Sequence, residues 1–303
     1  MATQQNTTRT TVTFPSNGMT LVGHLHAPEG AADGAPRPAV VVGHPTTGVK
    51  EQTADLYARR LAERGLTALT FDAACQGESE GEPRGLENPF QRADDFRNAV
   101  SYLTTRDDVD AARIGVLGIC GSGGYAPYAA QTDHRMKAVA TVSAADVPDF
   151  FRSADPEGFQ EMVERSGALR AEEAAGKPAT LVSAVPETVD TSTPAPVREF
   201  HDYYRTPRAH HPRATNEWVL RSADQLDQYD SYAGVGKLAP RPLLMIAGSE
   251  AFTLGHSRDA VERAGESAEL FTIEGATHVD LYDRDEAVGP AVERLAEFFG
   301  AHL

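Results

Sequence analysis

Short apolar runs alternate with amphipathic segments along most of this chain, and no other sequence feature constrains the fold as tightly. The runs have the length of strands, and the continuous run at residues 37–44 is typical of a strand buried on both faces. They cover residues 37–44, 66–73, 113–120, 136–144, 241–248 and 268–275. Segments with helical spacing follow at 51–65, 91–106, 121–131 and 285–303. Because the connections are short, this order predicts an α/β fold with a mostly parallel, doubly wound sheet.

The N-terminal segment has a different rhythm. Apolar and polar residues alternate over residues 11–28, and Ser16, Asn17 and Gly18 interrupt the alternation at its centre. Asn-Gly is typical of a two-residue turn between antiparallel strands. We therefore expect an antiparallel hairpin ahead of the parallel sheet.

The alternation of strands and helices stops after Ala145 and resumes at about residue 237. The intervening segment, residues 147–236, holds helical pieces, prolines and aromatic clusters. Because later strands complete the sheet begun earlier, we expect a core of residues 1–146 and 237–303 with an inserted cap at 147–236. Such a cap would cover the carboxyl ends of the strands, where open α/β sheets bind ligands. The alternative is a segment that serves packing or dimer contacts alone.

The composition limits partners and surroundings. The 303 residues carry a formal net charge of −16, which disfavours nucleic acids and anionic membranes as partners, and no apolar stretch is long enough for a membrane span. Two cysteines, Cys75 and Cys120, make no disulfide framework, and the opening residues lack a signal pattern, so we expect a cytoplasmic protein. With no glycine-rich nucleotide motif and no paired metal-ligand spacing, we expect no cofactor and no metal.

Residues 115–126, GVLGICGSGGYA, join the end of an apolar run to a cluster of small residues. A strand, a sharp turn and an immediate helix form the nucleophile turn Gly-x-Ser-x-Gly of many hydrolases. In that register Cys120 takes the serine position behind Gly118, whereas Ser122 would need glycine at position 120. A thiol at a helix N-terminus beside a histidine should have a lowered pKa and be a strong nucleophile. The alternative is a small buried cysteine with a packing role.

His278 is the candidate general base. It follows the last predicted strand and precedes the last helix, which is the position of the histidine in hydrolases with this nucleophile turn. The remaining histidines near strand ends or in the cap are expected to be structural, among them His24, His26, His44, His210, His211 and His256.

Two backbone N–H groups are expected to stabilise an oxyanion. One belongs to Gly121, directly after the nucleophile, and the other lies in the loop after residue 43. Pro45 in that loop has no N–H, so Thr46 is the expected donor. The alternative is that this is only a tight loop with a rigid start.

Four stretches together resemble a known family: residues 43–65, 71–100, 118–125 and 275–283. They are similar to the dienelactone-hydrolase-like branch of the α/β-hydrolases, and more narrowly to its group of bacterial uncharacterised hydrolases and fungal polyketide transferases. The resemblance runs from about residue 11 to the C-terminus. It implies an α/β-hydrolase fold and a cysteine–histidine–aspartate triad acting on esters, lactones or thioesters, in which Cys120 and His278 match the pattern.

The third member of that triad is missing. In the family, Gly-Ser-Glu-Ala is followed by aspartate, whereas Phe252 follows residues 248–251 here. Phenylalanine cannot accept the imidazole N–H, and loss of the acid in a related triad costs about 10⁴-fold in turnover. Glu250, two residues earlier, and Asp146, after the preceding strand, are the candidate replacements. The third alternative is that no acid is present.

These residues favour an acyl hydrolase, acyltransferase or cyclase that uses Cys120 on an ester, lactone or thioester of a small, partly hydrophobic molecule. Because Phe252 replaces the acid, the alternatives are a non-hydrolytic catalyst of a cyclisation or rearrangement, and a non-catalytic binder. Phe252, Cys75 and Ser122 are the expected pocket residues. A small molecule, free or on a thioester carrier, is the expected partner, and a homodimer stays open.

Overall fold

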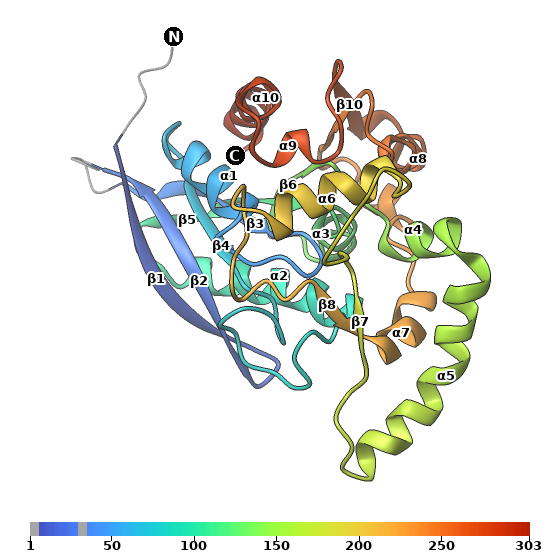
Figure 1. Ribbon diagram of the computed structural model, residues 1–303. Helices are drawn as coiled ribbons and strands as arrows, with labels where there is room; N and C mark the ends of the chain where they lie inside the picture. The colour runs from blue at the N-terminus through green and yellow to red at the C-terminus, as the bar shows by residue number, and fades with distance from the viewer. Residues whose placement is uncertain (1–5, 30–34) are drawn as a thin grey trace.

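The computed structural model describes residues 6–29 and 35–303. Its centre is an eight-stranded sheet in the order β1-β2-β4-β3-β5-β6-β9-β10 (Figure 1). The strands are β1 (Thr7–Ser16), β2 (Met19–Pro28), β3 (Arg37–Gly43), β4 (Thr67–Phe71), β5 (Val109–Ile119), β6 (Met136–Val142), β9 (Leu243–Gly248) and β10 (Ala268–Ile273). The pairings from β4 across to β10 are parallel, whereas β2 pairs antiparallel with both β1 and β4. The predicted mostly parallel sheet is confirmed.

A tight turn joins β1 and β2. Asn17 and Gly18 have φ angles of 47° and 84°, and Ser16 pairs with Met19 across them. Two positive φ angles match the twist of the flanking strands, which is why Asn-Gly suits this turn. The predicted antiparallel hairpin is confirmed, and its first strand begins at Thr7, earlier than the alternation indicated.

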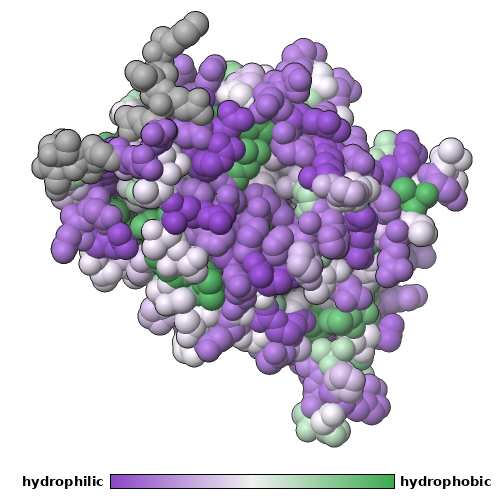
Figure 2. Space-filling view, turned by 60° about the vertical axis from the view of Figure 1, so that its left-hand side comes forward, coloured by the Kyte–Doolittle hydropathy of each residue, from purple (hydrophilic) through white to green (hydrophobic). Residues whose placement is uncertain are grey.

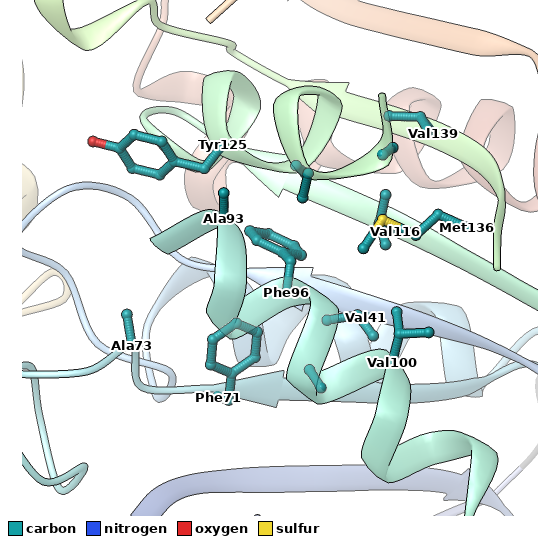
Figure 3. Close-up of a cluster of buried hydrophobic side chains, with 14 of the residues drawn as sticks. Val41, Phe71, Ala73, Ala93, Phe96, Val100, Val116, Tyr125, Met136 and Val139 are labelled. Atoms are coloured by element: carbon teal, nitrogen blue, oxygen red, sulfur yellow. The ribbon is translucent and has the colours of Figure 1, made fainter. Parts of the chain in front are cut away.

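Helices cover both faces of the sheet. One face packs against α2 (Pro89–Thr104), α3 (Ser122–Ala130) and α8 (Leu254–Ala264), and the other against α1 (Thr53–Ala62) and α10 (Asp285–His302). Successive strand residues enter different cores: Val41 faces the first, and Val40 and Val42 face the second. Figure 3 shows the first core, where side chains of α2 and α3 meet those of the strands. Burial on both sides explains why these strands are continuous apolar runs.

The segment between β6 and β9 holds four helices and a small separate sheet. These are α4 (Val147–Ala154), α5 (Pro156–Ala174), β7 (Leu181–Ser183), α6 (Ala195–Arg205), β8 (Glu217–Val219) and α7 (Ala223–Asp227). Helix α5 projects from the body at the lower right of Figure 1. Trp218 is buried in the first core and Tyr204 in the second, so the segment is anchored on both. Its standing as a separate cap stays a prediction.

Helix α8 was not expected from the sequence. Its apolar face is narrow, because only Leu254, Ser257, Ala260 and Ala264 are buried. Two of these side chains are alanine and one is serine, which gives a weak helical pattern. The contact of α8 with the first core therefore decided the structure of this segment.

The molecular surface is mainly hydrophilic on the face shown in Figure 2, where hydrophobic residues form small, separate patches. Within residues 6–29 and 35–303, no helix is both long and apolar enough to span a bilayer. Both observations agree with the charged composition.

Candidate active site

Cys120 lies at the tip of the turn between β5 and α3. Its φ of 54° is in the left-handed region, which is strained for a residue with a side chain. Its N–H donates to the carbonyl of Val142 (3.0 Å), and its carbonyl accepts from the N–H of Ala145 (2.9 Å), which ties the turn to the end of β6. A Cβ on Gly118 would lie 2.0 Å from the carbonyl oxygen of Ser122, so this position requires glycine. The small residues therefore let α3 begin directly behind Cys120.

The thiol of Cys120 is largely shielded from solvent. Burial raises the pKa of this thiol above its ordinary value, while the hydroxyl of Tyr282 and the N–H groups of Gly121 and Thr46 oppose the rise by hydrogen-bonding the thiolate. The lowered pKa expected from the sequence is wrong for this closed arrangement. The sequence motif shows the helix terminus but not the depth of burial.

The backbone N–H groups of Thr46 and Gly121 both reach the sulfur of Cys120. A Cβ on Gly121 would lie 2.1 Å from Oγ1 of Thr46, so the two segments are in close contact. In a tetrahedral intermediate the charged oxygen is bonded to the carbon that sulfur attacks. Donors that reach the sulfur are therefore beside the position that an oxyanion would occupy.

A buried hydrogen-bond network holds the loop that carries Thr46. Oγ of Ser122 donates to the carbonyl of His44 (2.6 Å), and Nη2 of Arg92 donates to the same carbonyl (2.9 Å). Nε2 of His44 accepts from the N–H of Ala73 (3.1 Å). Ser122 thus lies behind the turn and not in a substrate pocket, which corrects the expectation for it. Arg92 was not identified from the sequence, because one arginine in an amphipathic helix gives no signal.

His278 is buried between two hydroxyl groups. Its Nδ1 lies 2.7 Å from Oγ1 of Thr253, and its Nε2 lies 3.0 Å from the hydroxyl of Tyr282. The hydroxyl of Ser143 donates to its carbonyl (2.9 Å), which fixes the backbone behind the ring. Burial lowers the pKa of His278 to about 3. The imidazole is therefore neutral near pH 7 and able to accept a proton.

Thr253 takes the place expected for a carboxylate. Asp146 instead caps α4, where its side chain faces the N–H of Asp149 at 3.5 Å, and Glu250 is exposed. A threonine hydroxyl can donate or accept, so it orients the ring but brings no charge to it. The expectation that Glu250 or Asp146 partners His278 is thus replaced by Thr253, one residue beyond the phenylalanine that drew attention in the sequence.

Tyr282 was not identified from the sequence either. It belongs to the short helix α9 (Asp280–Asp283), four residues after His278. Its hydroxyl lies 3.0 Å from Nε2 of His278 and is close enough to Cys120 to oppose the rise in the pKa of the thiol. The result is a row of neighbouring side chains, Cys120–Tyr282–His278–Thr253, which we call the catalytic row; hydrogen bonds join its last three members. The spacing of four residues was the one available signal.

Aromatic rings surround the imidazole of His278. The ring centroids of Phe252 and Phe200 lie 4.9 Å and 5.5 Å from its own. Phe252 is 38% exposed, so it forms part of the surface over the histidine. Phe200 comes from α6, so the segment between β6 and β9 contributes to the site.

Cys75 lies in the loop after β4 and packs inside that loop. Its thiol is close to Gly81, where an added Cβ would lie 2.7 Å from the sulfur. Burial raises the pKa of this thiol to about 11, and both cysteines are free. The contacts support a packing role for Cys75 and do not place it in the expected pocket.

A cleft of about 330 Å³ reaches the catalytic row. Tyr282 forms part of its wall, opposite the start of α1. The rest of the lining is mostly polar and comes from Glu51, Gln52, Thr53, Leu56, Tyr203, Pro207, Arg208, Ala209, His210, His211 and Asp283. Tyr282 itself is fully buried, so the cleft ends against this side chain.

Comparison with known proteins agrees with this geometry. Residues 23–148 match the dienelactone hydrolase family. Uncharacterized protein YcjY of Escherichia coli K12 is 40% identical over 271 residues, which cover 86% of this chain and 87% of that protein. The crystal structure of hypothetical protein PA2218 from Pseudomonas aeruginosa has a TM-score of 0.91 at 34% identity, covering 98% of this chain and 94% of that one. Acyltransferase drtE of Aspergillus calidoustus is 27% identical over 280 residues, 86% of each chain. These matches confirm the resemblance drawn from the motifs.

Proposed function

This chain belongs to the dienelactone hydrolase family of α/β-hydrolases, and from that premise we propose that it is an acyl hydrolase or acyltransferase with Cys120 as the nucleophile. The substrate is an ester, lactone or thioester of a small, partly hydrophobic molecule. One observation carries the proposal: two backbone N–H groups, of Thr46 and Gly121, converge on a thiol at the tip of a strained turn. The name of the relative drtE, an acyltransferase, supports the same chemistry.

The catalytic row supplies the proton transfers. The thiol proton passes to the hydroxyl of Tyr282, whose own proton moves to Nε2 of His278, while the sulfur bonds to the acyl carbon. The π electrons of the carbonyl move onto its oxygen, and the N–H groups of Thr46 and Gly121 stabilise that charge. Collapse of the intermediate expels the leaving group, which takes the proton from His278. Attack on the acyl-thiol by water or a second nucleophile reverses these steps and restores the thiol.

Because the partner of His278 is the uncharged Thr253, some acyl donors suit this site better than others. A triad carboxylate stabilises the imidazolium that forms during attack, and Thr253 has no charge with which to do so. A thiol leaving group departs readily as thiolate, because its pKa of about 8.5 is far below that of an alcohol. We therefore rank thioesters ahead of simple alkyl esters as donors.

The surroundings of His278 suit an apolar acyl group. Phe200 and Phe252 offer two ring faces next to the imidazole, and Tyr204 packs behind them. The cleft at Tyr282 is polar, with histidine and arginine in its lining. We place the acyl chain among the aromatic rings and the polar carrier or leaving group in the cleft.

Trapping the acyl-enzyme tests the proposal. The full chain is incubated with acyl thioesters of N-acetylcysteamine and with aryl esters, and intact and peptide masses are recorded. We expect an acyl adduct on the peptide with Cys120 that decays in water, forms unchanged in Cys75→Ala and is absent from Cys120→Ala. An adduct found on Cys75 alone, or none with any donor, would overturn the assignment of the nucleophile.

A second candidate function rests on the neutral, buried His278 beside Tyr282. Such a pair can remove a proton from one substrate carbon and return it to another atom, which is the chemistry of a non-hydrolytic cyclisation or rearrangement. The two candidates differ in their need for sulfur. Turnover of a natural substrate that survives Cys120→Ala but not His278→Ala would select the second.

A further inference from the structure

A second cluster of ionisable side chains joins the N-terminal hairpin to α1. His24 and His26 project from the same face of β2, and Asp55 lies in the first turn of α1. Nδ1 of His24 lies 3.1 Å from Oδ1 of Asp55, and Nε2 of His26 lies 2.9 Å from the same oxygen. All three ligand atoms lie within 4.8 Å of one another. Asp55 is about thirty positions from the two histidines in sequence. The sequence led us to expect a structural role for His24 and His26.

We propose that His24, His26 and Asp55 form a binding site for a divalent transition-metal ion, with Zn²⁺ as the best match. Zinc takes imidazole nitrogen and carboxylate oxygen at about 2.0–2.1 Å, so tetrahedral ligand atoms lie about 3.3 Å apart. The distances from Oδ1 of Asp55 to the two histidine nitrogens, 3.1 Å and 2.9 Å, are close to that value. Three protein ligands leave a fourth position for water or another ligand.

The ligands are held by regular structure. Residues two apart on a strand point to the same side, so His24 and His26 face α1 together. Both are buried, at 7% and 2% exposure, and little rearrangement is needed for their rings to face one point. A site on a strand and a helix is better preorganised than one on loops.

An entry path exists for the ion. His24 forms part of the wall of a cavity of about 680 Å³, whose other lining residues are Arg9, Thr11, Val22, Glu51, Glu78 and Arg213. The cavity is separate in its lining from the cleft at Tyr282 except for Glu51. The fourth coordination position would therefore be reached by solvent through this cavity, and the site does not depend on the thiol chemistry.

A neighbouring cluster of carboxylates differs from the histidine cluster, because it already contains a cation from the chain. Glu51, Asp72 and Glu78 also bring three carboxylates together, but the ammonium of Lys50 lies 2.8 Å, 2.8 Å and 2.6 Å from their oxygens. A cation is thus built into that cluster by the chain itself. At the histidine cluster, Nη1 of Arg9 lies 3.7 Å from Oδ1 of Asp55, and the side chain of Arg9 is 56% exposed. An exposed side chain can move into solvent when an ion binds.

Metal titration tests the site in a chain without thiols or a histidine tag. In the Cys75→Ser/Cys120→Ser background, calorimetry with Zn²⁺ should give one equivalent bound, and Co²⁺ should give the visible absorption of a tetrahedral site. We expect about 100-fold weaker binding for Asp55→Asn and for His26→Ala, because each removes one of three ligands. Arg9→Gln should bind several-fold more tightly, because it removes a competing cation.

The control is the other histidine pair. His210→Ala/His211→Ala, in the cleft, should bind zinc as the background chain does. Folding of each variant is checked by circular dichroism, and the isosteric Asp55→Asn covers the case in which the buried His26→Ala fails to fold. Binding that survives in folded Asp55→Asn, binding lost in the His210/His211 variant, or no zinc binding below about 100 μM would overturn the proposal.

Discussion

The two ends of the catalytic row are built in different ways. At the nucleophile end, Cys120 is held by main-chain hydrogen bonds and faces the main-chain N–H groups of Thr46 and Gly121. At the other end, the imidazole of His278 is oriented by side chains, the hydroxyls of Thr253 and Tyr282. The family pattern is kept where the backbone makes the contacts and is altered where one side chain makes them.

This difference has a physical reason. A strained turn with close glycine contacts tolerates few substitutions, since an added Cβ at Gly118 or Gly121 would overlap a neighbour at 2.0 Å or 2.1 Å. In the loop after β9 the partner of His278 is a side chain, so replacing one residue changes the group that faces Nδ1 without moving the backbone of the nucleophile turn. Chemistry can therefore diverge at the histidine end while the nucleophile turn stays the same.

The largest effect is expected at the nucleophile end. Cys120→Ala should lower turnover of a thioester by about 10⁴-fold or more, as loss of a triad nucleophile does. Steady-state kinetics measure it, with Cys75→Ala as the matched control that keeps its rate. A loss of tenfold or less in Cys120→Ala would mean that Cys120 and His278 do not act together in turnover of the thioester.

At the histidine end, the lowered pKa of His278 should make the free energy of unfolding depend on pH. His278 has a pKa of about 3 in the folded chain and about 6.5 when unfolded, so below pH 6.5 the unfolded state binds the extra proton. Its contribution to stability is complete above pH 6.5 and is lost as pH falls towards 3. The unfolding constant should rise about tenfold per pH unit from this residue, or about 100-fold from pH 6.5 to 4.5.

Urea denaturation between pH 7 and pH 4.5 measures this dependence. Buried His44, whose pKa is also lowered by burial, contributes with the same sign and stays in both chains. The slope of the free energy of unfolding against pH reports the number of protons taken up on unfolding. In His278→Gln this number should be smaller by one than in the native sequence. Equal slopes would show that His278 is not neutral in the folded chain.

The middle of the row is tested through Tyr282. Tyr282→Phe removes the hydroxyl that stabilises the thiolate of Cys120, so the pKa of the thiol should rise and its alkylation at pH 8 should slow about 30-fold. The pH profile of iodoacetamide labelling gives both quantities. Tyr57→Phe is the control, because its buried hydroxyl donates to the carbonyl of Leu281 and not to the row. A thiol pKa that stays the same in Tyr282→Phe would remove Tyr282 from the proposed proton path.

The smallest effect is expected at Thr253. Thr253→Val keeps the shape and removes one neutral hydrogen bond to Nδ1 of His278, which should lower turnover about fivefold. Thr253→Ser should retain the native rate. Loss of a triad carboxylate costs about 10⁴-fold by comparison, so a loss above 10³-fold in the valine variant would show that Thr253 acts as the acid does elsewhere.

Much of the fold followed from the sequence. Apolar runs predicted β3 to β6, β9 and β10; most residues of β3, β4, β6 and β9 are buried, whereas β10 at the edge of the sheet keeps exposed positions. Asn17-Gly18 marked the hairpin, because two positive φ angles are needed there. The turn at Cys120 was visible for the same reason: a backbone that tight requires small residues at fixed positions. Local backbone geometry depends on a few neighbouring residues, so the sequence predicts it directly.

The partners of the functional side chains were decided only by tertiary structure. Thr253 reaches His278 from the loop after β9 and Tyr282 from helix α9, and Asp55 meets His24 and His26 from a helix about thirty residues further along the chain. The raised pKa of Cys120 likewise comes from burial by the assembled molecule. A hydrogen bond or a pKa shift depends on distances of a few ångströms between segments that are remote in sequence, and those distances exist only once the chain has packed.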